Sequence, residues 1–140
     1  MNISKNNKSL RTLVIESCGF SSEHLKTLLR KNNYNSVCVA NNLRTGINMA
    51  LAYQPDVIYL NLDLLKSAGL RVIPEIRKML PDVTIVMIAQ ITDRELCISE
   101  MLTSAILFGA NGFVFKPFNT SSIVDAMVKA EKKSVLAMAA

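Results

Sequence analysis

The sequence predicts an α/β fold: a doubly wound, five-stranded parallel sheet with the strand order 2-1-3-4-5 and helices on both faces. Two observations lead to this prediction. Residues 56–61, whose middle is wholly apolar, and residues 84–89 have the composition of strands buried on both faces of a parallel sheet. Along the whole chain, short apolar runs also alternate with amphipathic stretches, which is the pattern of repeated strand–helix crossovers.

The predicted strands are short runs rich in Val, Ile and Leu that end at turn residues. They cover residues 13–15, 37–40, 56–61, 84–89 and 113–115. Pro55 sets the start of the third strand. With the order 2-1-3-4-5, the carboxyl ends of the first, third and fifth strands surround one switch point. We therefore expect Glu16, Asn61 and Lys116 to meet there.

The predicted helices have apolar residues three or four positions apart and polar residues at their starts. They cover residues 21–32, 42–54, 70–80, 93–108 and 119–140. Ser21–Glu23, Asn41–Asn42 and Asn119–Ser122 supply the caps and the polar first turns. Lys66–Gly69 is predicted to be a loop, and Gly109 begins the turn that follows the fourth helix.

Length and composition favour one domain with a substantial core, because the chain has 140 residues and 50% of them are hydrophobic. We expect residues 10–140 to form this domain and the polar residues 1–9 to form a mobile arm. No apolar run approaches the roughly 20 residues of a membrane helix. The polar start also lacks the apolar core of a signal peptide, so we expect a cytoplasmic protein that makes no membrane contact.

The formal net charge of +5 raises the question of nucleic-acid binding. The sixteen Lys and Arg residues are, however, scattered along the chain, with no run longer than two, which favours a solvated surface. The three cysteines, Cys18, Cys38 and Cys97, are odd in number and lack metal-ligand spacing. This pattern predicts reduced thiols and neither a disulfide framework nor a metal site.

Four motifs occur in order between residues 10 and 132. They are Pro55–Leu60, Ala68–Leu70, Gly109–Phe113 and Phe115–Phe118. Together with the alternating elements, they resemble the receiver domain of two-component response regulators, the family of the chemotaxis protein CheY. This resemblance implies a flavodoxin-like, CheY-like fold and a role in signal transduction, as in a phosphorelay.

A working receiver carries a nucleophilic aspartate after its third strand, paired acids after its first, a Thr or Ser after its fourth and a lysine after its fifth. The acids hold magnesium, and the metal and lysine neutralise the phosphoryl oxygens. The matching positions here are Asn61, Glu16–Ser17, Ala89 and Lys116. An amide cannot form the acyl phosphate, and Ala89 cannot hydrogen-bond a phosphate. The resemblance therefore implies a degenerate pseudo-receiver without catalytic residues.

The degenerate positions form a pocket that we expect to be vacated: Glu16, Ser17, Asp63, Ala89 and Lys116. Glu16 is a poor magnesium site even with help from Asp63, so we expect no metal and no cofactor. Lys116 should bond Glu16 or loop carbonyl groups instead of a phosphate. Asp63, two residues beyond the acceptor position, remains an alternative acceptor.

Phe113 holds the family's switch-aromatic position, and with Ala89 nearby in place of a hydroxyl we expect it to point inward. The stretch after Ala89 is longer than usual by more than a helical turn, and one helix face cannot bury all its apolar residues. The fourth helix, fifth strand and fifth helix form one face, which contains Phe113, and we expect some of Leu96, Met101 and Leu102 to be exposed on it. Another signalling protein or a second copy of the chain is expected to dock there. Alternatively, the longer stretch covers its own apolar residues.

The sequence thus predicts a single-domain pseudo-receiver that is not an enzyme and acts by phosphorylation-independent protein–protein contact. Two alternatives stay open. One is a phosphorylatable receiver that uses a substitute acceptor such as Asp63. The other is the receiver part of a longer DNA-binding transcription regulator, which the basic charge favours slightly.

Overall fold

A computed structural model describes residues 10–90 and 95–139, with residues 95–98 and 134–139 described as backbone only. The predicted arm at residues 1–9 lies outside the described residues. Residues 91–94, in the stretch expected to be lengthened, also lie outside them. Within the described ranges, no helix combines the length and the apolar character needed to cross a membrane.

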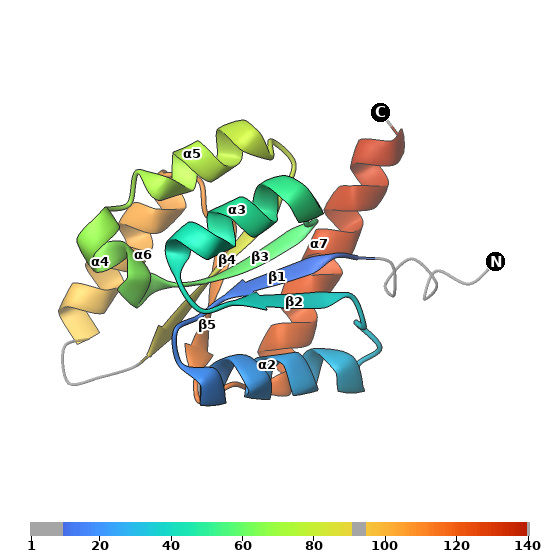
Figure 1. The fold of residues 1–140 in the computed structure, drawn as a ribbon, viewed down its shortest axis with the longest axis horizontal. Helices are drawn as coiled ribbons and strands as arrows, with labels where there is room; N and C mark the ends of the chain where they lie inside the picture. The colour runs from blue at the N-terminus through green and yellow to red at the C-terminus, as the bar shows by residue number, and fades with distance from the viewer. Residues whose placement is uncertain (1–9, 91–94, 140) are drawn as a thin grey trace.

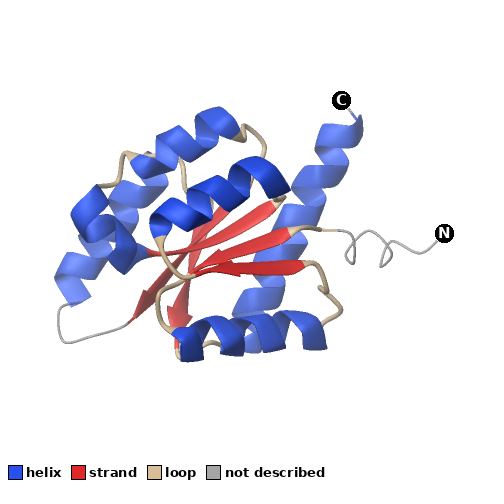
Figure 2. Ribbon diagram, viewed as in Figure 1, coloured by secondary structure: helices blue, strands red, loops and turns tan. Residues whose placement is uncertain are grey.

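Five parallel strands form one sheet in the order β2-β1-β3-β4-β5, as predicted (Figure 2). They are β1 (Thr12–Ile15), β2 (Val37–Ala40), β3 (Val57–Asn61), β4 (Thr84–Gln90) and β5 (Gly112–Lys116). All residues of β1 and β3 are buried, and so are those of β4 apart from Gln90. The doubly buried strands are therefore in the middle of the sheet, as their apolar sequences indicate.

Helices cover both faces of this sheet (Figure 1). They are α2 (Gly19–Lys31), α3 (Leu43–Tyr53), α4 (Leu65–Ala68), α5 (Val72–Met79), α6 (Glu95–Leu107) and α7 (Thr120–Ala139), with a 3₁₀ turn at Leu62–Leu64. α3, α4, α5 and α6 lie on one face, and α2 and α7 lie on the other. The prediction of helices on both faces is confirmed.

Each face of the sheet has its own core because neighbouring strand residues point to opposite sides. Ile58 and Leu60 of β3 join the core under α3 to α6, whereas Val57 and Tyr59 join the core under α2 and α7. All four side chains are fully buried. Each such burial stabilises the fold by about 1.5–3 kcal/mol, so the two cores hold the strand ends in fixed positions.

Two local predictions are wrong. The first helix begins at Gly19 rather than at the predicted Ser21–Glu23 cap, because the hydroxyl group of Ser22 is buried inside the first turn and donates to the Gly19 carbonyl oxygen at 3.0 Å. The predicted loop Lys66–Gly69 is largely helical, because α4 contains Lys66 and is anchored by the buried Leu65. Asn42 does cap α3, where its side chain accepts from the Thr45 backbone N–H at 2.8 Å.

Candidate functional site

The site lies at the carboxyl edge of the sheet, where the first, third and fifth strands end. Glu16 directly follows β1, Asn61 is the last residue of β3, and Lys116 is the last residue of β5. β4 lies between β3 and β5, so Lys116 reaches back over it to contact Glu16. The structure therefore brings Glu16, Asn61 and Lys116 together, as the strand order predicts.

Glu16 is at the centre of these contacts, with only 1% of its surface exposed. The Lys116 ammonium group forms an ion pair with Glu16 Oε1. The Asn61 side-chain amide donates to Glu16 Oε2, which also accepts from the Cys18 backbone N–H at 3.4 Å. Isolated burial of a carboxylate is costly, and these donors compensate its lost hydration.

Asn61 is itself fully engaged. Its Nδ2 group donates to Glu16, and its Oδ1 atom accepts from the Asp63 backbone N–H at 2.8 Å. Because the carboxylate requires a donor and the backbone N–H requires an acceptor, these two partners fix the orientation of the amide. The second contact also starts the 3₁₀ turn that follows β3. With 5% exposure, Asn61 has its whole amide inside the site.

Not all residues of the predicted vacated pocket are gathered here. Asp63 has 63% of its side chain exposed and forms an ion pair with Lys66 Nζ at 3.0 Å. Ser17 is exposed, while Ala89 is buried and lies opposite Phe115 in the sheet. The prediction that Asp63 belongs to the pocket is therefore wrong, because its side chain turns to solvent and pairs with Lys66. The predicted contact of Lys116 with Glu16 is confirmed, and it fills the buried part of the site.

The acidic groups at this edge do not suit a magnesium ion, which needs several carboxylate or carbonyl oxygens. Glu16 is already paired with Lys116 and Asn61, and Asp63 is paired with Lys66 outside the site. In the described part of the chain, no three His, Cys, Asp or Glu side chains form a group that could hold a metal ion. The donor set present does not fit the family's metal.

Cys18 borders the site in a way that its sequence context did not predict. It is an exposed thiol at the N-cap position of α2, and its backbone N–H faces Glu16. A hydrogen bond with the Ser21 side chain lowers the pKa of this thiol. Its position between a strand end and a helix start was the one sequence signal that could have indicated exposure.

Phe113 does not point inward, so that expectation is wrong. It is 45% exposed, and its ring packs edge to face on Phe115 with a centroid distance of 5.3 Å and an interplanar angle of 69°. Aromatic pairs of this geometry contribute about 0.5–1.5 kcal/mol beyond buried area. The contact with Phe115 therefore favours the outward position, and Ala89 lies opposite Phe115 rather than Phe113 in the sheet.

The expected partner face is apolar, and the predicted Phe113 is exposed on it. Of the other candidates, Leu102 is buried because this side of α6 packs on the sheet, Met101 is half-buried against the core, and the side chain of Leu96 lies outside the described residues. The large exposed side chains here are those we call the α6–β5 patch: Ile106, Leu107, Phe108 and Phe113.

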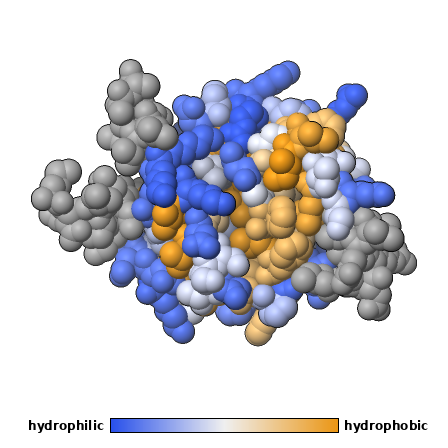
Figure 3. Space-filling model, turned by 180° about the vertical axis from the view of Figure 1, so that it is seen from behind, coloured by the Kyte–Doolittle hydropathy of each residue, from blue (hydrophilic) through white to orange (hydrophobic). Residues whose placement is uncertain are grey.

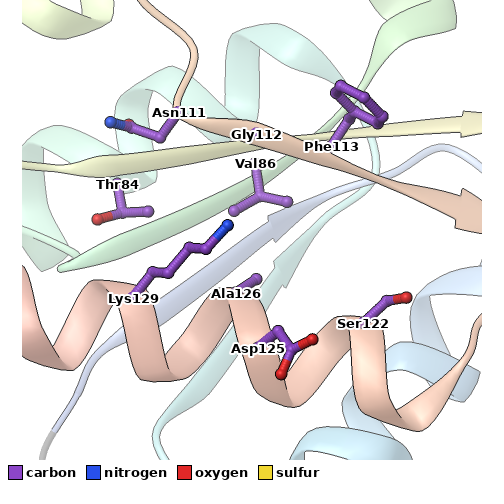
Figure 4. Close-up of a pocket in the computed structure, with 9 residues that line it drawn as sticks. All are labelled: Thr84, Val86, Asn111, Gly112, Phe113, Ser122, Asp125, Ala126 and Lys129. Carbon is purple, nitrogen blue, oxygen red and sulfur yellow. The ribbon is translucent and has the colours of Figure 1, made fainter.

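Two hollows flank the outer edge of β5. A groove of about 380 Å³ lies between α6 and β5, and apolar side chains of the α6–β5 patch line it (Figure 3). A smaller hollow of about 220 Å³ lies between β5 and α7, where Thr84, Ser122 and Lys129 provide polar groups (Figure 4). Phe113 borders both hollows, and its ring points away from α7 (Figure 4).

Comparison with known proteins identifies the family to which this fold belongs. The family model of the response regulator receiver domain matches residues 12–128, and the chain therefore belongs to this family. The chemotaxis protein CheY of Thermotoga maritima is 27% identical over 122 residues, which cover 87% of this chain and 98% of that protein. The CheY protein of Bacillus subtilis is 24% identical over 85% of this chain and 95% of its own length.

Solved structures show the same fold. The crystal structure of a putative response regulator from Chloroflexus aurantiacus matches with a TM-score of 0.75 and 18% identity, covering 88% of this chain and 98% of that one. The fold, the strand order and the family match thus define a receiver domain of the two-component signalling type.

Proposed function

We propose that this chain is a pseudo-receiver, which acts in signal transduction by protein–protein contact and does not accept a phosphoryl group. The proposal is based on the position and the hydrogen bonding of Asn61. Its amide occupies the acceptor position and is held by the Glu16 carboxylate, which Lys116 also binds. An amide offers no anionic oxygen for attack on phosphorus, and the lysine that would neutralise a phosphoryl group is already paired.

The alternative acceptor, Asp63, has little support from its surroundings. Phosphoryl transfer depends on a metal ion and a lysine that are positioned around the transferred group. Asp63 is mostly solvent-exposed and paired with Lys66, while Lys116 is paired with Glu16. We therefore propose a binding module without a metal or cofactor, rather than an enzyme or a phosphotransfer protein.

We infer that the α6–β5 patch is the surface through which the protein contacts another signalling protein or a second copy. Leu107 is 82% exposed, and Ile106, Phe108 and Phe113 are each 40–45% exposed. Ile106, Leu107 and Phe113 line one groove. Adjacent large apolar side chains of this kind are typical of interaction sites. The proposed place of action is the cytoplasm, as the sequence predicts.

The proposal is tested by incubating the purified protein with acetyl phosphate and magnesium and then measuring its intact mass. We expect no added phosphoryl group, whereas an intact receiver domain treated in parallel should become labelled. A hydroxylamine-sensitive adduct on this chain, mapped to Asp63, would contradict the pseudo-receiver proposal and support the substitute-acceptor alternative.

A further inference from the structure

Glu16 is bound in the manner of a ligand. Its carboxylate receives three contacts from three elements: the Lys116 ammonium at the end of β5, the Asn61 amide at the end of β3 and the Cys18 backbone N–H at the start of α2. The carboxylate is almost wholly buried, and Asn61 is 5% exposed. Together these groups form a closed cage of donors around one anion.

The same donors suit a free oxyanion. An ammonium group and a side-chain amide form charge-assisted hydrogen bonds with phosphate as readily as with carboxylate. The Cys18 N–H adds a backbone donor at the start of a helix of 13 residues, where the positive end of the helix dipole favours negative charge. The cage is therefore a built oxyanion site, and its occupant belongs to the protein itself.

We propose that Glu16 is the built-in ligand of this oxyanion site and keeps free tetrahedral oxyanions such as phosphate out of it. Because the carboxylate is attached to the same chain, its effective concentration at the cage is very high, and dissolved phosphate competes poorly. Removal of Glu16 leaves Lys116 as a largely buried cation without its partner, which a phosphate ion can neutralise.

The experiment compares the wild type with Glu16→Ala during titration with inorganic phosphate, at ionic strength held constant with chloride. Binding is measured by calorimetry and by the midpoint of thermal unfolding, which a native-state ligand raises. We expect a flat response for the wild type and an affinity at least about tenfold higher for Glu16→Ala. The double variant Glu16→Ala/Lys116→Ala should lose that gain.

A matched control separates the cage from a general loss of negative charge. Asp63→Ala also removes a carboxylate near this edge, but one that is exposed and paired with Lys66 outside the cage. We expect its phosphate response to equal that of the wild type. An equal gain from Asp63→Ala and Glu16→Ala would overturn the proposal, because it would mean that net charge alone governs phosphate binding.

The proposal remains testable if Glu16→Ala does not fold in plain buffer. Phosphate-dependent refolding of that variant would then support the proposal, and Glu16→Ser, which shortens the side chain and keeps it polar, should gain phosphate binding. Phosphate binding to the wild type with the affinity of the variants, or no phosphate response in either variant, would overturn it. The proposed function is tested separately, because phosphoryl transfer is measured on the wild-type chain.

Discussion

The carboxyl edge of the sheet and the α6–β5 patch are two regions of the same domain that differ in how far their side chains are satisfied by contacts within the chain. At the sheet edge, Glu16, Asn61 and Lys116 satisfy one another in a buried cluster. On the patch, Leu107 and its neighbours leave apolar surface uncovered by any described residue. The cluster at the sheet edge is thus internally paired, whereas the patch is the larger exposed apolar surface of the two regions.

The largest effect on stability should follow from loss of the buried cation. Lys116→Met removes the partner of Glu16, whose side chain is 0% exposed, and leaves a carboxylate in the interior. We expect the free energy of unfolding to fall by about 3 kcal/mol, because breaking a buried ion pair strands the remaining charge. Urea denaturation of the variant and the wild type measures this difference.

Lys66→Met is the matched control for this prediction. It also removes a lysine paired with an acid, but both side chains of the Asp63–Lys66 pair are more than 60% exposed. Solvent screening limits such pairs to less than about 1 kcal/mol. Equal costs for the two variants would show that the sheet edge does not hold the buried ion pair described above.

A smaller loss of stability is expected from Asn61→Asp, which restores the aspartate at the family's acceptor position. The new carboxylate lies next to Glu16, and this repulsion is partly offset because Lys116 can pair with it. We expect a loss of about 1 kcal/mol in urea denaturation. Acetyl phosphate and magnesium should still add no phosphoryl group, because Ser17 supplies no carboxylate for the metal and Ala89 supplies no hydroxyl group for the phosphate.

The stringent comparison for Asn61→Asp is a combined variant that also carries Glu16→Asp, Ser17→Asp and Ala89→Thr. This chain regains the acids and the hydroxyl group of a working receiver and should accept a phosphoryl group by intact mass. If the single Asn61→Asp variant were labelled to the same extent, the native residues at positions 16, 17 and 89 would be sufficient for phosphoryl transfer.

Substitution of the patch should barely change stability. Leu107→Glu places a charge on a side chain that is 82% exposed, and such changes usually alter the free energy of unfolding by less than about 0.5 kcal/mol. Partner binding or self-association should nevertheless be lost, since a charge would be buried in an apolar contact. Sedimentation velocity and pull-down from the native cells, compared with the wild type, measure these losses.

Leu51→Glu offers a control for the patch, because Leu51 is a 49% exposed apolar residue on α3. It should leave every interaction intact. The assignment of the patch fails if Leu107→Glu also preserves all interactions while folded variants of Asn61 or Lys116 lose them. The sheet edge would then be the functional surface.

The sequence was sufficient for the sheet and for the meeting of Glu16, Asn61 and Lys116. Doubly buried strands have an unmistakable apolar composition, and parallel strands place their carboxyl ends at one edge. The sequence was not sufficient to predict the orientation of single side chains on the outer face. The expectation for α6 considered only the number of its apolar residues, although helical spacing places Leu107 beside the polar Glu100, Thr103 and Ser104, in agreement with its exposure. The outward Phe113 packs on Phe115, two residues further along the same strand, and the sequence pattern does not determine which orientation of the ring this contact favours.

The weakest interaction that we expect is with nucleic acid, which the net charge of +5 could attract to either region. On α7, Lys129 and Lys132 are exposed, and the exposed Asp125 lies one helical turn before Lys129. We expect only non-specific binding with a dissociation constant of about 10⁻⁵ M or weaker, which declines further between about 50 and 200 mM salt as counterion release requires. Fluorescence anisotropy with a random duplex measures both properties. Tight, sequence-selective binding by this chain alone that persists at the higher salt concentration would contradict the protein–protein proposal, because specific readout requires contacts with base edges as well as phosphates.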